Sequence, residues 1–199
     1  MGSALLGGRS GLRLLVLLAL HVGAVVAVAA AGAEIRVDGD ILAELDALPG
    51  SGLVPLADSR YLLLEFNRFG MPPDPLELTH ELRVAGWVPV YAHPEHIPFL
   101  AGDLELMAQL AAAGALFQVT AGSLAGDHGR LTLDRASQMV DAGLVHFVAS
   151  DAHGTGFRPP GLSRVRDLIA RRWGDDAAWT LTSGNPRAVV EDRPLPEAP

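Results

Sequence analysis

The chain has 199 residues and a mass of 20.9 kDa, the size of one globular domain with a sizeable core. Its formal net charge of −8 and pI near 5.2 argue against a nucleic-acid partner. It contains no cysteine, which excludes disulfides, thiolate metal sites and a cysteine nucleophile.

The first predicted element is an apolar segment in which His21 is the only polar side chain from Leu14 to Ala33. Its length and its small residues suit a signal peptide or membrane anchor over residues 12–33. The alternative is a helix broken at Gly23 and a buried strand that leads to Glu34. The segment by itself favours neither arrangement over the other.

Beyond Glu34, helical and extended patterns alternate along the chain. Helices are predicted where apolar residues recur at helical spacing between a capping Asp and a Gly, and strands where short apolar runs lie between turns. The predicted helices span 38–50, 74–86, 102–114, 132–143, 161–174 and 175–184, and the predicted strands span 61–66, 87–93, 115–122 and 144–150. This order predicts an α/β fold with parallel strands, in a barrel or in an open doubly wound sheet.

Acidic residues and histidines gather at the predicted strand ends. In parallel α/β folds the functional groups lie at the carboxyl ends of the strands. Four of the five ends carry an acid or a histidine. The positions at or just beyond these ends are Glu34, Glu65, His93, the turn 120–123, and Asp151 with His153.

This set of side chains predicts a metal site. Asp151 and His153 are two residues apart, so both point to the same side of an extended chain. Carboxylates combined with imidazoles suit manganese, iron or zinc, and Glu34 and Glu65 can bridge two ions while His93 completes a shell. Taken alone, Asp151 with His153 is more typical of a plain strand end, Glu65 is compatible with the plain end of a buried segment, and His93 with a turn histidine. Their convergence on one face of one fold favours the metal site.

Other polar residues are candidates for contacts with an anion. Arg158, in a Gly/Pro loop after His153, can grip a phosphate with its forked donors. His96 is a candidate proton donor. For His128 the favoured interpretation is a surface loop histidine, and His80 and His146 are interpreted as structural.

The motifs "GAEIR", "SRYLLLEF", "PVYAHPEH", "FQVTAGSLAGDHG", "HFVASDAHGTGFRPPGL" and "SGNPRAVV" have the order and spacing of a known family. The chain resembles the bacterial manganese-dependent tyrosine-protein phosphatases of the polymerase-and-histidinol-phosphatase (PHP) superfamily. The resemblance implies a distorted barrel of seven parallel strands, manganese or another divalent metal, and hydrolysis of phosphotyrosine. The implied partner is a bacterial tyrosine kinase that controls capsule or exopolysaccharide export.

Carried over to this sequence, the resemblance makes five residues metal ligands and leaves Arg158 as a phosphate contact. The implied ligands are Glu34, Glu65, His93, Asp151 and His153. His96 stands where the family usually has an arginine after "AHPE". The family's His-x-His on the first strand, the Asp-Asp-Gly turn after it and a further histidine are not present before Glu34.

The resemblance therefore predicts a barrel that is incomplete at its N-terminus. In the family a helix and a strand lead into the glutamate of "GAEI", so the resemblance also favours the helix and strand over a signal peptide or anchor, and with them a cytoplasmic protein, because signal cleavage would remove most of that strand. The expected organisation is an apolar segment over 1–30, a phosphatase domain over 31–190 and a Pro-rich tail over 191–199. Two alternatives to a tyrosine phosphatase stay open. One is a catalytically impaired remnant that binds a partner or has no function. The other is a PHP phosphoesterase that acts on a small phosphate monoester.

Overall fold

The computed structural model describes residues 21–22, 24–25, 32, 34–37, 54–66, 74–152 and 161–195. The predicted helix over 38–50 and the candidate site residues His153 and Arg158 lie outside this part of the chain. Among the helices that the structure describes, none is both long enough and apolar enough to cross a membrane.

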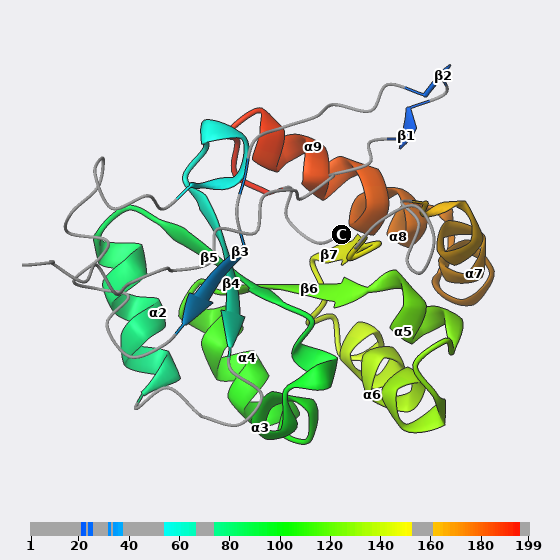
Figure 1. The fold of residues 1–199 in the computed structure, drawn as a ribbon, viewed down its shortest axis with the longest axis horizontal. Coiled ribbons are helices and arrows are strands. Elements are labelled where there is room, and N and C mark those ends of the chain that lie inside the picture. The colour runs from blue at the N-terminus through cyan, green and yellow to red at the C-terminus, as the bar shows by residue number, and fades with distance from the viewer. Residues whose placement is uncertain are drawn as a thin grey trace, which may run out of the picture.

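The centre of the fold is a sheet of five parallel strands in the order β3-β4-β5-β6-β7 (Figure 1). These strands are β3 (Glu34–Val37), β4 (Tyr61–Phe66), β5 (Val88–Ala92), β6 (Leu116–Thr120) and β7 (Phe147–Ala149). Each new strand adds at the same edge, as in a segment of a barrel, whereas a doubly wound sheet reverses direction. The α/β class with parallel strands is confirmed. The described strands form an open sheet, so the closed seven-stranded barrel stays a prediction.

The remaining elements alternate with these strands or follow them. Two short strands, β1 (His21–Val22) and β2 (Ala24–Val25), form a separate antiparallel pair. The helices are η1 (Leu56–Asp58), α2 (Pro75–Val84), η2 (Pro94–His96), α3 (Pro98–Ala101), α4 (Leu104–Ala112), α5 (Ala121–Ala125), α6 (Arg130–Asp141), α7 (Ser163–Trp173), α8 (Asp175–Trp179), the π-helix η3 (Thr180–Gly184) and α9 (Asn185–Val190).

Three local predictions were wrong. The expected turn at 120–123 is mostly helical, because α5 begins at Ala121, directly after β6. The last strand spans only Phe147–Ala149, instead of 144–150. Glu34 is the first residue of β3 and not its end, because the parallel register continues the strand to Val37 beside Phe66.

The two faces of the sheet have different coverings, because alternate side chains of each strand point to opposite faces. Leu62, Leu64 and Phe66 of β4 belong to the larger core, which helices α2 to α8 cover. Tyr61 and Leu63 point to the other face, where they pack in a smaller cluster with η1 and α9. Glu65 follows the parity of Tyr61 and Leu63. The candidate site therefore lies on the face that the larger set of helices leaves uncovered.

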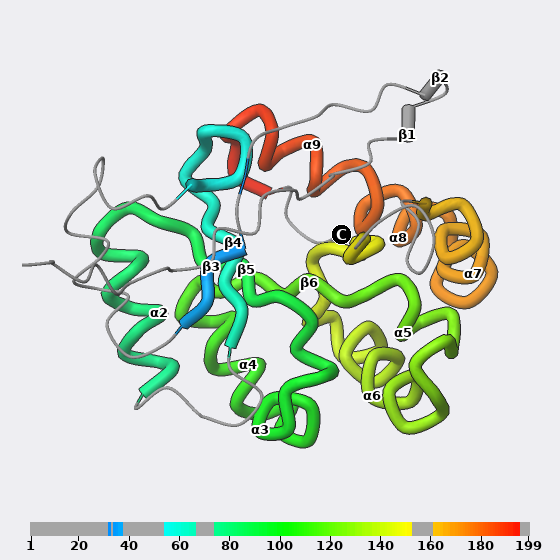
Figure 2. The backbone as a smooth tube through the Cα atoms, in the orientation of Figure 1, coloured from blue at the N-terminus to red at the C-terminus, as the bar shows by residue number. Residues whose placement is uncertain are grey.

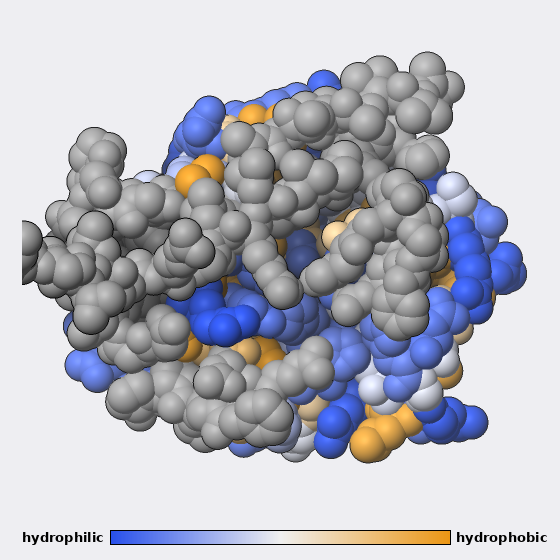
Figure 3. Space-filling view, viewed as in Figure 1, coloured by the Kyte–Doolittle hydropathy of each residue, from blue (hydrophilic) through white to orange (hydrophobic). Residues whose placement is uncertain are grey.

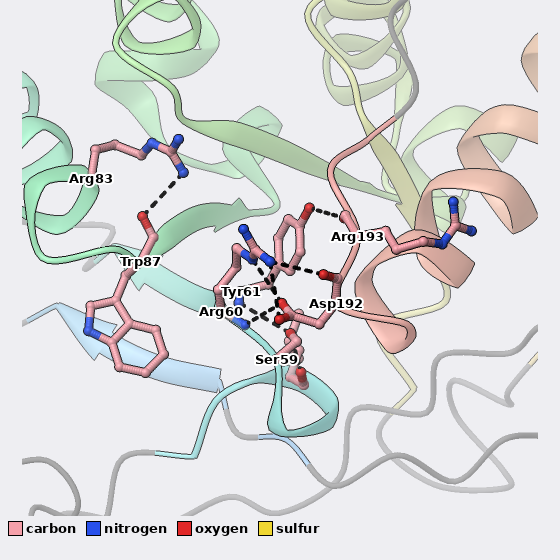
Figure 4. Close-up of polar contacts among 8 residues, drawn as sticks. Ser59, Arg60, Tyr61, Arg83, Trp87, Asp192 and Arg193 are labelled. Carbon is pink, nitrogen blue, oxygen red and sulfur yellow. Dashed lines mark hydrogen bonds and ion pairs between the residues drawn. The ribbon is translucent and has the colours of Figure 1, made fainter.

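The beginning of β4 is tied to the end of the chain. The guanidinium of Arg60 donates to the carboxylate of Asp192 at 2.9 Å, and the hydroxyl of Tyr61 donates to the carbonyl oxygen of Arg193 at 2.6 Å (Figure 4). In Figure 2 the red end of the tube accordingly lies beside the cyan segment that holds η1 and β4. These contacts hold α9 and η1 over the amino ends of the strands.

Candidate functional site

The sheet brings two carboxylates to one face. Neighbouring strands pair Arg36 with Glu65 and Glu34 with Leu63, and Glu34, Leu63 and Glu65 all project from the same side. Both glutamates are about one-quarter exposed, at 25% for Glu34 and 26% for Glu65. A hydrophilic patch is visible near the tips of β3 and β4 (Figure 3). Two neighbouring acids in this position favour a cation.

His93 completes the cluster from the end of β5. Its backbone adopts the left-handed conformation, with φ 36° and ψ 53°, which is uncommon for a residue with a side chain and often marks a functional position. The Nε2 atom lies 3.2 Å from Glu34 Oε1 and 3.6 Å from Glu65 Oε1. The tight turn thus aims a buried imidazole between two acids from neighbouring strands.

The surroundings of His93 favour its charged form. Burial lowers the pKa of the imidazole, but its hydrogen bond with Glu34 and the negative charge there raise it. The carboxylates of Asp151 and Glu65 add to this increase, and the net direction of the pKa is upward. The three carboxylates thus stabilise a positive charge at this position, and the same negative charge attracts a divalent cation.

The chemistry of this cluster fits a metal ion. One ligand atom from each of Glu34, Glu65 and His93 lies within 4.8 Å of the other two. Two carboxylate oxygens and an imidazole nitrogen are ligands that manganese, iron and zinc accept. The other ring nitrogen, His93 Nδ1, is buried and has no hydrogen-bond partner among the described residues. Metal-ligating histidines usually donate a hydrogen bond through their second ring nitrogen. Among the described residues, no acceptor for such a hydrogen bond lies beside Nδ1.

The other predicted site residues differ in their placement. Asp151 lies two residues after the end of β7 and has a left-handed φ of 49°. Its carboxylate acts on His93 electrostatically. Arg36 lies 3.7 Å from Glu65, so it shares one of the two acids of the cluster. The positions of His153 and Arg158 relative to the cluster stay predictions.

His96 lies next to the cluster, with its ring centroid 6.1 Å from that of His93. It belongs to a group of polar side chains that the sequence patterns did not reveal. Glu95 is fully buried in this group, and burial raises the pKa of its carboxyl group, opposed by hydrogen bonds from Ser123 and Thr120. His128 was interpreted as a surface loop residue. It is exposed, but it contacts Ser123 and the ring of His96.

The fold and this carboxylate–imidazole cluster define the class of the protein: a parallel α/β protein with a candidate metal centre at one face of its sheet. Residues 21–191 match the family model of capsular polysaccharide synthesis proteins CpsB/CapC. The chain belongs to this family.

Several relatives have similar sequences. CapC of Staphylococcus aureus is 38% identical over 128 residues, which are 64% of this chain and 49% of CapC. The tyrosine-protein phosphatase YwqE of Bacillus subtilis (strain 168) is 34% identical over 151 residues, 76% of this chain and 58% of YwqE. The tyrosine-protein phosphatase CpsB of Streptococcus pneumoniae is 30% identical over 171 residues, 83% of this chain and 69% of CpsB. The chain thus spans about half of CapC, the relative with the highest identity of these three.

The fold is also similar to a solved structure. A chain from the crystal structures of YwqE from Bacillus subtilis and CpsB from Streptococcus pneumoniae superimposes with a TM-score of 0.77 at 30% identity. The match covers 84% of this chain and 66% of that chain. Those two proteins are metal-dependent tyrosine phosphatases.

Proposed function

We propose that this chain is a metal-dependent phosphatase that hydrolyses phosphotyrosine on protein. The observation that carries the proposal is the Glu34–Glu65–His93 cluster, which offers three ligand atoms within 4.8 Å on one face of a parallel sheet. Family membership and the activities of YwqE and CpsB support it. The match covers only 58% of YwqE, so the phosphatase activity of that protein is a proposal for this chain.

The proposed metal ligands are Glu34, Glu65, His93, Asp151 and His153, and the proposed metal is manganese. A bound divalent metal lowers the pKa of a water molecule and polarises a phosphoryl oxygen. The proposed ligands would hold that charge on the face of the sheet that carries Glu34 and Glu65. Arg36, beside Glu65, holds the acid in place from the exposed side.

The other proposed residues act on the phosphate. Arg158 grips the non-bridging oxygens, which carry the developing charge. His96, whose ring lies 6.1 Å from that of His93, protonates the tyrosyl oxygen. A tyrosine hydroxyl has a pKa of about 10, so it departs poorly as an anion and gains from a proton donor.

The proposed partner is a phosphotyrosine-bearing protein in the cytoplasm, such as a bacterial tyrosine kinase. The description of the family as capsular polysaccharide synthesis proteins supports a role in polysaccharide export or synthesis. A phosphotyrosine peptide is therefore the first substrate to test, and small sugar phosphates are the comparison.

The test combines metal binding with hydrolysis. Purified protein loaded with manganese is expected to hydrolyse a phosphotyrosine peptide, and chelation is expected to abolish the reaction. Glu65→Gln and His93→Asn each remove one ligand charge or nitrogen, so we expect a loss of about 100-fold in kcat/KM and weaker manganese binding by calorimetry. His80→Gln, on the exposed side of α2, is the matched control and should keep both.

Two results would contradict this function. Wild-type protein without bound manganese and without hydrolysis of any phosphate monoester would favour the impaired remnant. Faster hydrolysis of a small sugar phosphate than of the phosphotyrosine peptide would favour the other type of phosphoesterase.

A further inference from the structure

A second polar cluster lies beside the candidate metal centre, where η2 meets α5. Its central atom is the hydroxyl oxygen of Ser123, a fully buried residue. This Oγ atom lies 2.7 Å from Glu95 Oε1, 3.3 Å from His96 Nε2 and 3.1 Å from His128 Nδ1. The neighbouring residues Glu95 and His96 and the more distant His128 thus converge on one hydroxyl group, and only His96 belongs to the proposed reaction.

The donors and acceptors of this cluster can be assigned from its geometry. Glu95 Oε1 accepts a hydrogen bond from the backbone N–H of Thr120 at 2.9 Å, so this oxygen is an acceptor. The single hydroxyl hydrogen of Ser123 goes to the same oxygen, which is its shortest contact. The lone pairs of Oγ then accept N–H groups from the imidazoles. This places a hydrogen on Nε2 of His96 and on Nδ1 of His128.

The two imidazoles extend from the candidate metal centre to the surface. The ring of His96 lies 6.1 Å from that of His93 and 5.0 Å from that of His128. The side chain of His96 is only 19% exposed, whereas His128 lies at the surface. His128 also lines a pocket of about 430 Å³ together with Thr120, the last residue of β6, and Ser150, which follows β7.

Gly122 allows this arrangement. A Cβ atom on Gly122 would lie 3.1 Å from both Cε1 and Nε2 of His128, closer than an ordinary van der Waals contact. The absence of a side chain therefore lets the His128 ring lie against α5 and reach Ser123. The position of the ring is defined by packing as well as by its hydrogen bond.

We propose that Ser123 is a positioning residue of this site, which fixes the tautomer and orientation of His96 and joins His128 to it. This inference rests on the proposed function, because it assigns a task to His96 in the hydrolysis of an aryl phosphate. With Nε2 of His96 directed at Ser123, Nδ1 is the nitrogen that gains and gives the second proton. Ser123 and His128 act through His96 and do not touch the substrate.

Hydrolysis of the aryl phosphate supplies one proton to the leaving group and releases one proton from the attacking water. The bond from phosphorus to the aryl oxygen breaks, its electron pair stays on that oxygen, and a proton from His96 neutralises it. The attacking water forms the new phosphorus–oxygen bond, and the proton that it loses returns to the imidazole pair. The pair is unchanged after each turnover.

The first test uses leaving groups of different basicity. Ser123→Ala and His128→Gln should lower kcat/KM for a phosphotyrosine peptide by about 10- to 100-fold, because its leaving group needs a proton. The same variants should lose less than about threefold with 2,4-dinitrophenyl phosphate, whose leaving group departs as an anion. An equal loss with both substrates would overturn the proposal. His80→Gln is again the control, since His80 is an exposed histidine on α2.

The second test needs no activity. The ¹⁵N signals of the histidine rings distinguish the two neutral tautomers, and we expect Nε2–H for His96 and Nδ1–H for His128. Ser123→Ala should change the signals of both rings and leave His80 unchanged. Unchanged signals in this variant, or the opposite tautomers in the wild type, would overturn the positioning role even in an active enzyme. The expected tautomers in a protein without phosphatase activity would instead contradict only the proposed function.

Discussion

His146 connects neighbouring parts of the structure through uncharged contacts. Its Nδ1 atom accepts a hydrogen bond from the backbone N–H of Phe117 at 3.1 Å, and its carbonyl oxygen accepts one from Asn185 at 2.8 Å. Burial lowers the pKa of the imidazole from 6.5 to about 4. A proton on Nδ1 would also remove the acceptor of the Phe117 hydrogen bond. The structural role expected from the sequence thus has a specific physical basis.

The consequence is a dependence of stability on pH. Between pH 6.5 and about 4 the unfolded chain binds a proton at His146 that the folded chain does not bind. The stability from this group is therefore complete above pH 6.5 and falls as the pH decreases, by about 3 kcal/mol over the whole window. His146→Asn keeps an acceptor for Phe117 but does not titrate. We expect urea unfolding of this variant to vary less between pH 7 and pH 5 than that of the wild type, and identical slopes would contradict this account.

At the residue scale, a site residue can be predicted from the sequence when its position depends on a single strand. Glu65 and His93 were predicted as candidates because each lies at the end of an apolar run, and parallel strands end at one edge. Glu95 and His128 carry no such signal, and Ser123 was indicated only as part of the turn predicted at 120–123. The contact between Glu95 and Ser123 joins residues 28 positions apart, and the packing of η2 against β6, which α5 directly follows, brings them together.

Helix α2 shows how a short element is defined by its first residues. The Oδ1 atom of Asp74 accepts hydrogen bonds from the backbone N–H groups of Leu76 and Glu77, both at 2.9 Å. Pro75 takes the first helical position, where a missing N–H has no cost. The helix ends at Val84, and Gly86 adopts a left-handed φ of 90° in the turn that follows.

We expect Asp74→Ala to destabilise the protein by about 1 kcal/mol, because it removes the acceptor for two helix N–H groups. Asp74→Ser keeps a capping oxygen and should lose much less. Urea unfolding followed by circular dichroism measures both variants. Equal losses in the two would show that the negative charge, and not the cap, is the stabilising feature.

At the scale of elements, periodicity made the helices predictable, with capping aspartates as a further signal for α2 and α4, and α2, α4, α6 and α7 were predicted close to their observed bounds. The strand ends were less predictable. The segment 144–150 reads as one apolar strand, but its first residues, Leu144 and Val145, lie in the larger core before β7 begins. A buried residue in a connection has the same composition as a buried residue in a strand, so pattern alone does not separate the two.

At the scale of the whole molecule, the start of β4 is joined to the residues that follow α9. Tyr61 is only 2% exposed, and its hydroxyl group is the partner of the Arg193 carbonyl oxygen. The carboxylate of Asp192 accepts hydrogen bonds from both the backbone N–H and the guanidinium of Arg60. This connection spans 132 positions in the sequence, which no local pattern indicates.

Tyr61→Phe should lower the free energy of unfolding by about 1 kcal/mol, because the Arg193 carbonyl loses its partner in a partly buried place. It should also make the residues after α9 more sensitive to proteases. Arg83→Ala removes only a 3.4 Å contact with the Trp87 carbonyl and serves as a control with a smaller effect. A wild-type rate of C-terminal cleavage in Tyr61→Phe would mean that Arg60 and Asp192 alone retain this end.

The alternation along β4 sets a limit on how this protein tolerates changes in length. Tyr61, Leu63 and Glu65 face one side of the sheet, whereas Leu62, Leu64 and Phe66 face the helices on the other. Inserting or deleting one residue within Tyr61–Phe66 would exchange these two sets, because the period of a strand is two residues. A carboxylate would enter the apolar layer and a leucine or phenylalanine would stand beside His93. The length of β4 is therefore under stricter constraint than the identity of its individual apolar residues. Proteins recombined from members of this family must keep that length unchanged.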